Sequence, residues 1–124
     1  MANLNSMVGF LVTTNPEAAR SFFAEILGFR LLSDDQYALA FDTGNARLRV
    51  VKAQSFSPAH GTVLGWEVED IHVAVADLHA KGVVFDRYPS MLADEQGIFT
   101  FPSGDQVAWF KDPEGNLLSL SKHV

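Results

Sequence analysis

The side chains that could perform chemistry are few in this sequence and far apart. Glu67 interrupts an apolar run, there is no cysteine, and the four histidines are His60, His72, His79 and His123. Without cysteine there is no thiolate nucleophile, no disulfide and no cysteine-based zinc site. His72 and His79 lie on one predicted helix with Cα atoms about 10 Å apart, too far for one ion to bridge comfortably.

The other two histidines fall in irregular parts of the chain. His60 lies in a Pro-Ala-His-Gly linker, and His123 follows the last predicted strand, where fraying is expected. We interpret all four as surface or loop residues. That leaves Glu67 and the alternating serines near the end of the chain, Ser119 and Ser121, as the candidates for a polar site.

The elements that must position these residues occur twice. Asn15 is a helix N-cap followed by Pro16, and Gly28 ends that helix. Asp70 and Gly82 mark a second helix in the same way, with a spacing of 12 residues against 13 in the first copy. The chain therefore contains an internal repeat.

Each copy reads as strand, helix and three strands. Helices are predicted at 16–27 and 71–81, and strands at 7–13, 30–32, 37–42, 47–54, 63–69, 83–86, 106–111 and 117–122. The caps lie 55 residues apart and the turn asparagines, Asn45 and Asn116, lie 71 apart; segment 87–106 holds the roughly 16 extra residues.

This order predicts an α+β fold of two βαβββ modules that form a curled mixed sheet around a cleft. We expect a single domain over residues 1–124, with module one at about 1–56, a linker at about 57–62 and module two at about 63–124. The length suits one domain with a real core.

Composition excludes several classes of partner. The net charge of −6 argues against nucleic acid, whose phosphates demand a basic surface. No apolar run is long enough to span a membrane, and the first ten residues lack the layout of a signal peptide. We expect a cytoplasmic protein that binds neither nucleic acid nor membrane.

The repeat, with its helix caps and turns, resembles the pattern of the vicinal oxygen chelate superfamily. This superfamily includes glyoxalase I, extradiol dioxygenases, fosfomycin-resistance enzymes and bleomycin-resistance proteins. The resemblance covers nearly the whole chain. It rests on Asn15–Ala19 with Phe22 and Phe23, Leu27–Phe29, Val68–Asp70 with Gly82, and Trp109–Asn116.

The resemblance implies where a metal would be held. Metal-dependent members use His, Glu or Gln from four inward strand positions, which correspond here to Val8, Val63, Ser119 and Leu48; a slip of one residue replaces Leu48 by Arg47 or Arg49. None of these side chains suits a divalent ion, so we expect no metal and no cofactor. Ser119 then marks either a lost metal site or a small residue where two sheets approach.

Strand alternation places residues in phase with Val8 and Val63 toward the predicted cleft. By the same alternation Trp66 packs under the second helix. The segment 87–106 is rich in aromatic residues and is either a flap over a ligand or a dimer contact. The predicted ligand-binding residues are Phe10, Val12, Arg49, Glu67, Phe99, Phe101, Trp109 and Ser119.

The resulting hypothesis is a metal-independent protein of the glyoxalase/bleomycin-resistance type that binds a small organic molecule and forms a homodimer. Two enzyme hypotheses remain as alternatives: a metal-dependent lyase or dioxygenase, and a metal-free acid–base enzyme that uses Glu67. Glu67 would bind a cation or act as a base; otherwise it is hydrated and idle.

Overall fold

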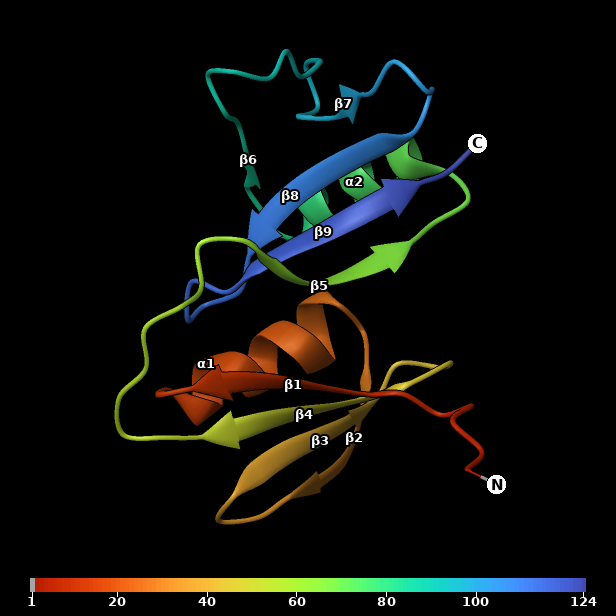
Figure 1. Cartoon of the computed structure of the whole chain (residues 1–124). Helices are drawn as coiled ribbons and strands as arrows, with labels where there is room; N and C mark the ends of the chain where they lie inside the picture. The colour runs from red at the N-terminus through yellow and green to blue at the C-terminus, as the bar shows by residue number, and fades with distance from the viewer. Residues whose placement is uncertain (1) are drawn as a thin grey trace. The chain divides into compact units, whose positions relative to one another are not determined.

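The computed structural model describes residues 2–124, and the chain divides between Ser57 and Pro58 into two compact units. Unit one is the part up to Ser57, and unit two is the part from Pro58 onward (Figure 1). No helix in the described residues has the length and apolar character needed to cross a membrane.

Unit one is a four-stranded mixed sheet with one helical segment. Its elements are β1 (Val8–Thr13), α1 (Pro16–Arg20), the π-helix η1 (Ser21–Ile26), β2 (Arg30–Asp34), β3 (Ala38–Asp42) and β4 (Arg47–Lys52). The strand order is β1-β4-β3-β2, in which β1 pairs with β4 in parallel and the other pairs are antiparallel.

Unit two repeats this arrangement with one added strand. Its elements are β5 (Thr62–Glu67), α2 (Ile71–Ala80), β6 (Phe85–Asp86), β7 (Phe99–Thr100), β8 (Gln106–Lys111) and β9 (Leu117–Lys122). The order is β5-β9-β8-β6, and β7 pairs with β8. The α+β class and the βαβββ repeat are confirmed, with the strands hydrogen-bonded into two mixed sheets, neither of them closed into a barrel.

The helix signals act as predicted, with one local difference. The side chains of Asn15 and Asp70 accept hydrogen bonds from the backbone N–H groups of residues three positions later, at 3.2 Å and 3.1 Å. Gly28 and Gly82 end the helices with φ of 78° and 97°, a region that favours glycine. In η1 the backbone N–H of Leu27 donates to the carbonyl oxygen of Phe22, five residues earlier. Such a π-turn adds one residue, which accounts for the longer spacing in the first copy.

The two units bury the same pair of side chains on neighbouring strands. Phe41 lies opposite Leu48 in unit one, and Phe110 lies opposite Leu118 in unit two, with no more than 1% of any of the four exposed. The Phe41 ring packs on Phe23, and the Phe110 ring packs on Phe85 and Trp66.

Figure 1 shows α2 against one face of the sheet of unit two. The Trp66 ring stacks on the buried ring of Phe110, and Trp66 is out of phase with Glu67. In each unit the helix therefore packs on one face of the sheet and leaves the other face, called here the helix-free face, to other uses.

Candidate functional site

The helix-free face of unit one is apolar with two arginines. In the register of β1 and β4, Val8 lies opposite Arg47, Phe10 opposite Arg49, and Val12 opposite Val51. Phe10 is 63% exposed, and Val12 and Arg49 are half-buried; on the alternate positions Leu11, Leu48 and Val50 are buried in the core. Three predicted ligand-binding residues, Phe10, Val12 and Arg49, thus share one face.

The register corrects one assignment. Leu48 is 1% exposed and lies in the core, so it is not the unit-one counterpart of Ser119. Arg49 takes that place, because Phe10 pairs with Arg49 in the way that Gly65 pairs with Ser119, five residues before each helix cap. Matching the two copies by their turn asparagines gave Leu48 because Asn116 lies three residues before Ser119, whereas Asn45 lies four residues before Arg49.

The strand positions at which the resemblance implies metal ligands do not suit a divalent ion in this chain. They carry valine, arginine and serine; apolar and cationic side chains cannot serve as ligands, and a lone hydroxyl is a poor one. Within residues 2–124 no three His, Asp or Glu side chains gather in a group that could hold an ion.

The helix-free face of unit two is more polar. Gly65 and Glu67 of β5 lie opposite Ser119 and Ser121 of β9, and Trp109 of β8 lies opposite Ser119 from the other side. Glu67 is exposed, so its carboxylate stands in water beside Ser121. Val63 lies at an irregularity in the pairing of β5 with β9, which interrupts the simple alternation there.

The close approach of Gly65 and Ser119 explains why Ser119 is small. A Cβ atom at Gly65 would collide with Ser119 Oγ and lie 3.2 Å from the Ser119 carbonyl oxygen. The hydroxymethyl group of Ser119 therefore fills the space that the missing side chain leaves. A glutamate in place of Ser119 would have to direct its longer side chain away from this position.

A pocket of about 470 Å³ opens on unit two beside Trp109. Phe101 and Trp109 are the largest side chains that line it, and each packs on a second ring. The ring centroids of Phe99 and Phe101 are 4.8 Å apart, and those of Tyr88 and Trp109 are 5.4 Å apart. The residues that line it are Phe101, Pro102, Ser103, Asp105, Gln106, Val107, Trp109, Ser121 and His123. Of the predicted ligand-binding residues, Phe101 and Trp109 line this pocket, Phe99 supports it, and Glu67 and Ser119 lie on the same sheet face.

The polar side of the pocket is a chain of three side chains. His123 Nε2 lies 3.1 Å from Ser121 Oγ, and His123 Nδ1 lies 3.3 Å from Asp105 Oδ2. The backbone N–H of Val124 donates to Asp105 Oδ1 at 2.9 Å. The pKa of Asp105 is lowered from its ordinary value, mainly by the hydrogen bond from the Val124 N–H and to a smaller extent by His123. Asp105 is therefore a carboxylate at neutral pH.

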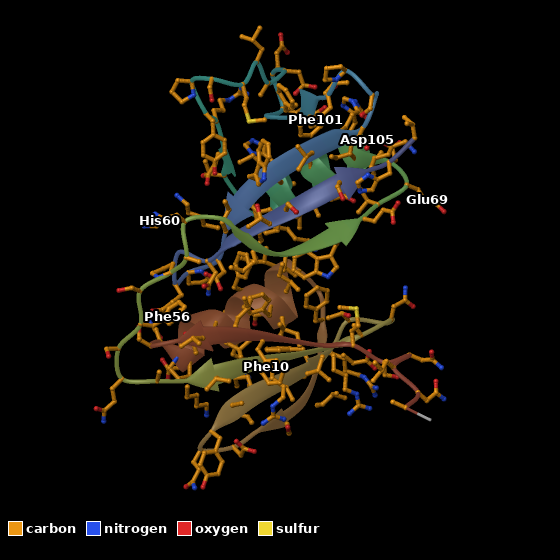
Figure 2. All side chains as sticks on the ribbon, in the orientation of Figure 1. Phe10, Phe56, His60, Glu69, Phe101 and Asp105 are labelled. Atoms are coloured by element: carbon orange, nitrogen blue, oxygen red, sulfur yellow. The ribbon has the colours of Figure 1, made fainter. Side chains whose placement is uncertain are left out.

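Sequence reasoning missed this group. It assigned His123 to a fraying end, whereas the structure holds His123 between Asp105 and Ser121; Figure 2 labels Asp105 and Phe101 in the same region of unit two. The available signal was the spacing of Ser119, Ser121 and His123, which are two residues apart and so fall on one side of an extended chain.

The segment 87–106 is held by contacts with two other elements of unit two, β8 and α2, and by hydrogen bonds within itself. β7 pairs with β8, and the Arg87 guanidinium donates to the carbonyl oxygens of Asp94 and Glu95 at 2.8 Å and 2.6 Å. Gln96 bonds the side chain and the carbonyl of His72 on α2. The segment therefore has a defined conformation and supplies Phe101 to the pocket.

The sequence from residue 4 to residue 120 matches the model of the Glyoxalase/Bleomycin resistance protein/Dioxygenase superfamily. The chain belongs to this superfamily. Comparison with curated proteins gives no match.

Several solved structures share the fold. TnmS3, an antibiotic binding protein from Streptomyces sp. CB03234, has a TM-score of 0.77 at 24% identity, covering 100% of this chain and 99% of that one. Lactoylglutathione lyase from Agrobacterium tumefaciens has a TM-score of 0.75 at 15% identity, with 98% and 95% covered. TioX from Micromonospora sp. ML1 has a TM-score of 0.72 at 24% identity, with 96% and 98% covered. At these identities the likeness concerns the fold.

Proposed function

We propose that this chain binds a small, largely apolar organic molecule in the pocket of unit two and does so without a metal. The observation that carries the proposal is the pocket itself: about 470 Å³, walled by Phe101 and Trp109, with polar groups at one side. Small-molecule sites typically combine an apolar wall with a few placed polar groups. A flat or aromatic ligand is the class that these rings favour.

Two further observations support the proposal. The strand positions at which the resemblance implies metal ligands carry valine, arginine and serine. These residues favour a binding function over that of a metal-dependent lyase or dioxygenase. TnmS3, a solved structure of the same fold, is an antibiotic binding protein, which supports a binding role for this chain.

The binding proposal is tested by tryptophan fluorescence. The chain has two tryptophans, so Trp66→Phe leaves Trp109 as the sole reporter and keeps a ring against Phe110. Titration with a panel of neutral aromatic compounds should change the Trp109 emission with saturable binding. Because substitution of Trp109 removes the reporter, its variants are compared with the parent by titration calorimetry. Trp109→Ala should weaken binding about tenfold, and the matched Trp109→Phe variant should weaken it less, because a ring contact contributes about 0.5–1.5 kcal/mol beyond burial. No response to any compound of the panel would overturn the proposal.

The absence of a metal is tested separately. We expect purified protein to carry no stoichiometric Zn, Ni, Fe or Mn, and chelators to leave its melting temperature unchanged. One tightly held ion per chain by elemental analysis would contradict this part of the proposal.

The proposed assembly is a homodimer, acting in the cytoplasm. Its support is the apolar helix-free face of unit one, where Phe10 is 63% exposed and Val8 is 44% exposed. Light scattering should give twice the chain mass of 13.6 kDa, and Phe10→Glu should lower that value. A mass of one chain across the micromolar range would refute the dimer.

A further inference from the structure

Ser121, His123 and Asp105 have the arrangement of a nucleophile, a base and an orienting carboxylate. The three are linked in that order by separations of 3.1 Å from Ser121 Oγ to His123 Nε2 and 3.3 Å from His123 Nδ1 to Asp105 Oδ2. Such a group is recognised by geometry and role, not by position in the chain. The proposed binding function does not require the arrangement of Ser121, His123 and Asp105.

The fold sets the arrangement from two elements. Ser121 lies near the end of β9 and His123 directly follows the strand. The 3.1 Å contact between the two side chains shows that both project from the same side of the chain. Asp105 comes from the turn before β8, and its second oxygen is held by the backbone N–H of Val124 at 2.9 Å. With a hydrogen on Nδ1 directed at Asp105, Nε2 is left to accept the hydroxyl hydrogen of Ser121.

All three side chains line the pocket. Ser121 is half-buried and lines the pocket, so it is partly accessible to a molecule bound there. Ser103 and Gln106 also line this pocket. The Gln106 amide donates to Thr100 Oγ1 at 3.3 Å, and Ser103 Oγ accepts from the backbone N–H of Asp105.

We propose that Ser121 is a nucleophile that takes an acyl group from a small neutral ester bound in this pocket, with His123 as general base and Asp105 as positioning residue. The inference rests on the pocket of the proposed binding function and adds an activity to it.

The charge around Ser121 defines the ester class. Glu67 lies directly opposite Ser121 on the adjoining strand. Asp105 is linked to Ser121 through His123. Two carboxylates disfavour an anionic substrate. Phe101 and Trp109 favour an apolar acyl or aryl group.

The step balances without any further reactant than water. Ser121 Oγ attacks the ester carbonyl carbon while its proton passes to His123 Nε2; the carbon–oxygen bond of the ester then breaks, and the leaving alkoxide takes that proton. The product is an ester on Ser121. Water repeats the sequence, releasing the carboxylic acid and restoring the hydroxyl.

The test uses the full chain and p-nitrophenyl acetate. We expect nitrophenolate release with one acetyl group retained per chain by intact mass, mapped by peptide analysis to Ser121. Ser121→Ala should abolish that adduct, and Ser121→Cys, which keeps a nucleophile, should restore acylation. His123→Ala should slow it about a hundredfold, the scale of a positioned base.

The matched controls are an exposed serine and an exposed histidine elsewhere in the chain. Ser33→Ala on β2 and His60→Ala near the start of unit two should acylate at the parent rate. Melting curves check that each variant is folded. An adduct that maps only to another residue, or one that survives in folded Ser121→Ala, overturns the inference. So does a parent protein that shows neither an adduct nor nitrophenolate release faster than that of folded Ser121→Ala.

The role of Asp105 needs a readout that loss of structure would not imitate. The ¹⁵N shifts of the His123 ring report which nitrogen carries the hydrogen. The parent should show the Nδ1–H form, and Asp105→Asn should shift the ring toward a mixture while acylation slows. An unchanged ring signal in Asp105→Asn would remove Asp105 from the proposal.

The two proposals fail separately. Saturable binding seen through Trp109 without acylation refutes only the nucleophile. Acylation at Ser121 without saturable binding of the aromatic panel refutes only the binding function.

Discussion

Units one and two have the same strand order and the same buried pairs, yet their helix-free faces carry unlike side chains. Arg49 and Phe10 form a registered pair in unit one, where Ser119 and Gly65 stand in unit two. Val12 occupies the place of Glu67, three residues before the helix cap in each copy.

This difference separates two kinds of constraint. The positions under the helices must fill a core, so they remain apolar in both units. The helix-free positions are free of that demand, so one unit has bulky apolar and basic residues there, while the other has glycine, serines and a carboxylate. The insertion 87–106 then adds Phe101 to unit two alone, and only that unit acquires the pocket described above.

The largest expected effect tests whether the two cores are equivalent. Phe41→Ala and Phe110→Ala each remove a fully buried ring, so each should lower the free energy of unfolding by about 3–5 kcal/mol in urea titrations. Phe56→Ala, at a ring that is 37% exposed, is the control and should cost far less. A small loss of unfolding free energy at either position would mean that the two cores do not contribute equally to stability.

The second test concerns the contact of Gly65 with Ser119. Gly65→Ala should destabilise by about 1–3 kcal/mol, the usual cost of overpacking, because the new methyl group meets Ser119 Oγ. Combining it with Ser119→Ala should recover part of the loss in a double-mutant cycle. Phe10→Ala, at the corresponding place in unit one, should change stability little because Phe10 is 63% exposed. Additive effects of the two unit-two substitutions would contradict the contact.

The third test compares the two turns. Asp112 is buried and accepts from the backbone N–H groups of Glu114 and Asn116 and from the Asn116 side chain, at 2.8–3.0 Å. Asp112→Ala should cost about 1–3 kcal/mol, since it removes the acceptor of buried donors. Asp42→Ala, in the more exposed turn of unit one, should cost less. Equal losses in denaturant titrations would show that burial is not the deciding factor.

The smallest expected effect is a difference in acid response. In unit one, the hydrogen bond from Lys52 lowers the pKa of Asp34, and the backbone N–H of Gly44 lowers the pKa of Asp42, both from an ordinary value of 3.8. Their stabilisation is present above that value and is lost as the pH falls through the folded-state pKa. In unit two, burial raises the pKa of Asp112, so its effect has the opposite sign: stability falls as the pH rises from 3.8 through the raised pKa.

Amide hydrogen exchange measured at about pH 5 and about pH 3 reports this difference residue by residue. Unit one should lose more protection than unit two on acidification, although Asp105 partly offsets Asp112 in unit two. Asp34→Asn should reduce the loss in unit one. Equal losses of protection in the two units of the parent would count against the opposite pKa shifts of Asp34 and Asp112.

Local signals carried most of the fold prediction. The caps at Asn15 and Asp70, the glycines at 28 and 82 and the strands at 106–111 and 117–122 are all found where the sequence placed them. β7 was not predicted, because a strand of two residues has no periodicity to read. The unit-one counterpart of Ser119 was wrong by one residue because strand pairing, not distance from a turn, sets which side chains share a face.

The sequence by itself determined the repeat, the α+β class and the alternation that puts Glu67, Ser119 and Ser121 on one face, because caps, turns and strand periodicity act between near neighbours. Only the tertiary structure decided that Gly65 accommodates Ser119, that Phe101 and Trp109 wall one pocket, and that Asp105 meets His123 across 18 residues of chain. Those contacts depend on the register of β5, β8 and β9 and on the path of the inserted segment. Register is set by long-range pairing and core packing, which no local pattern specifies.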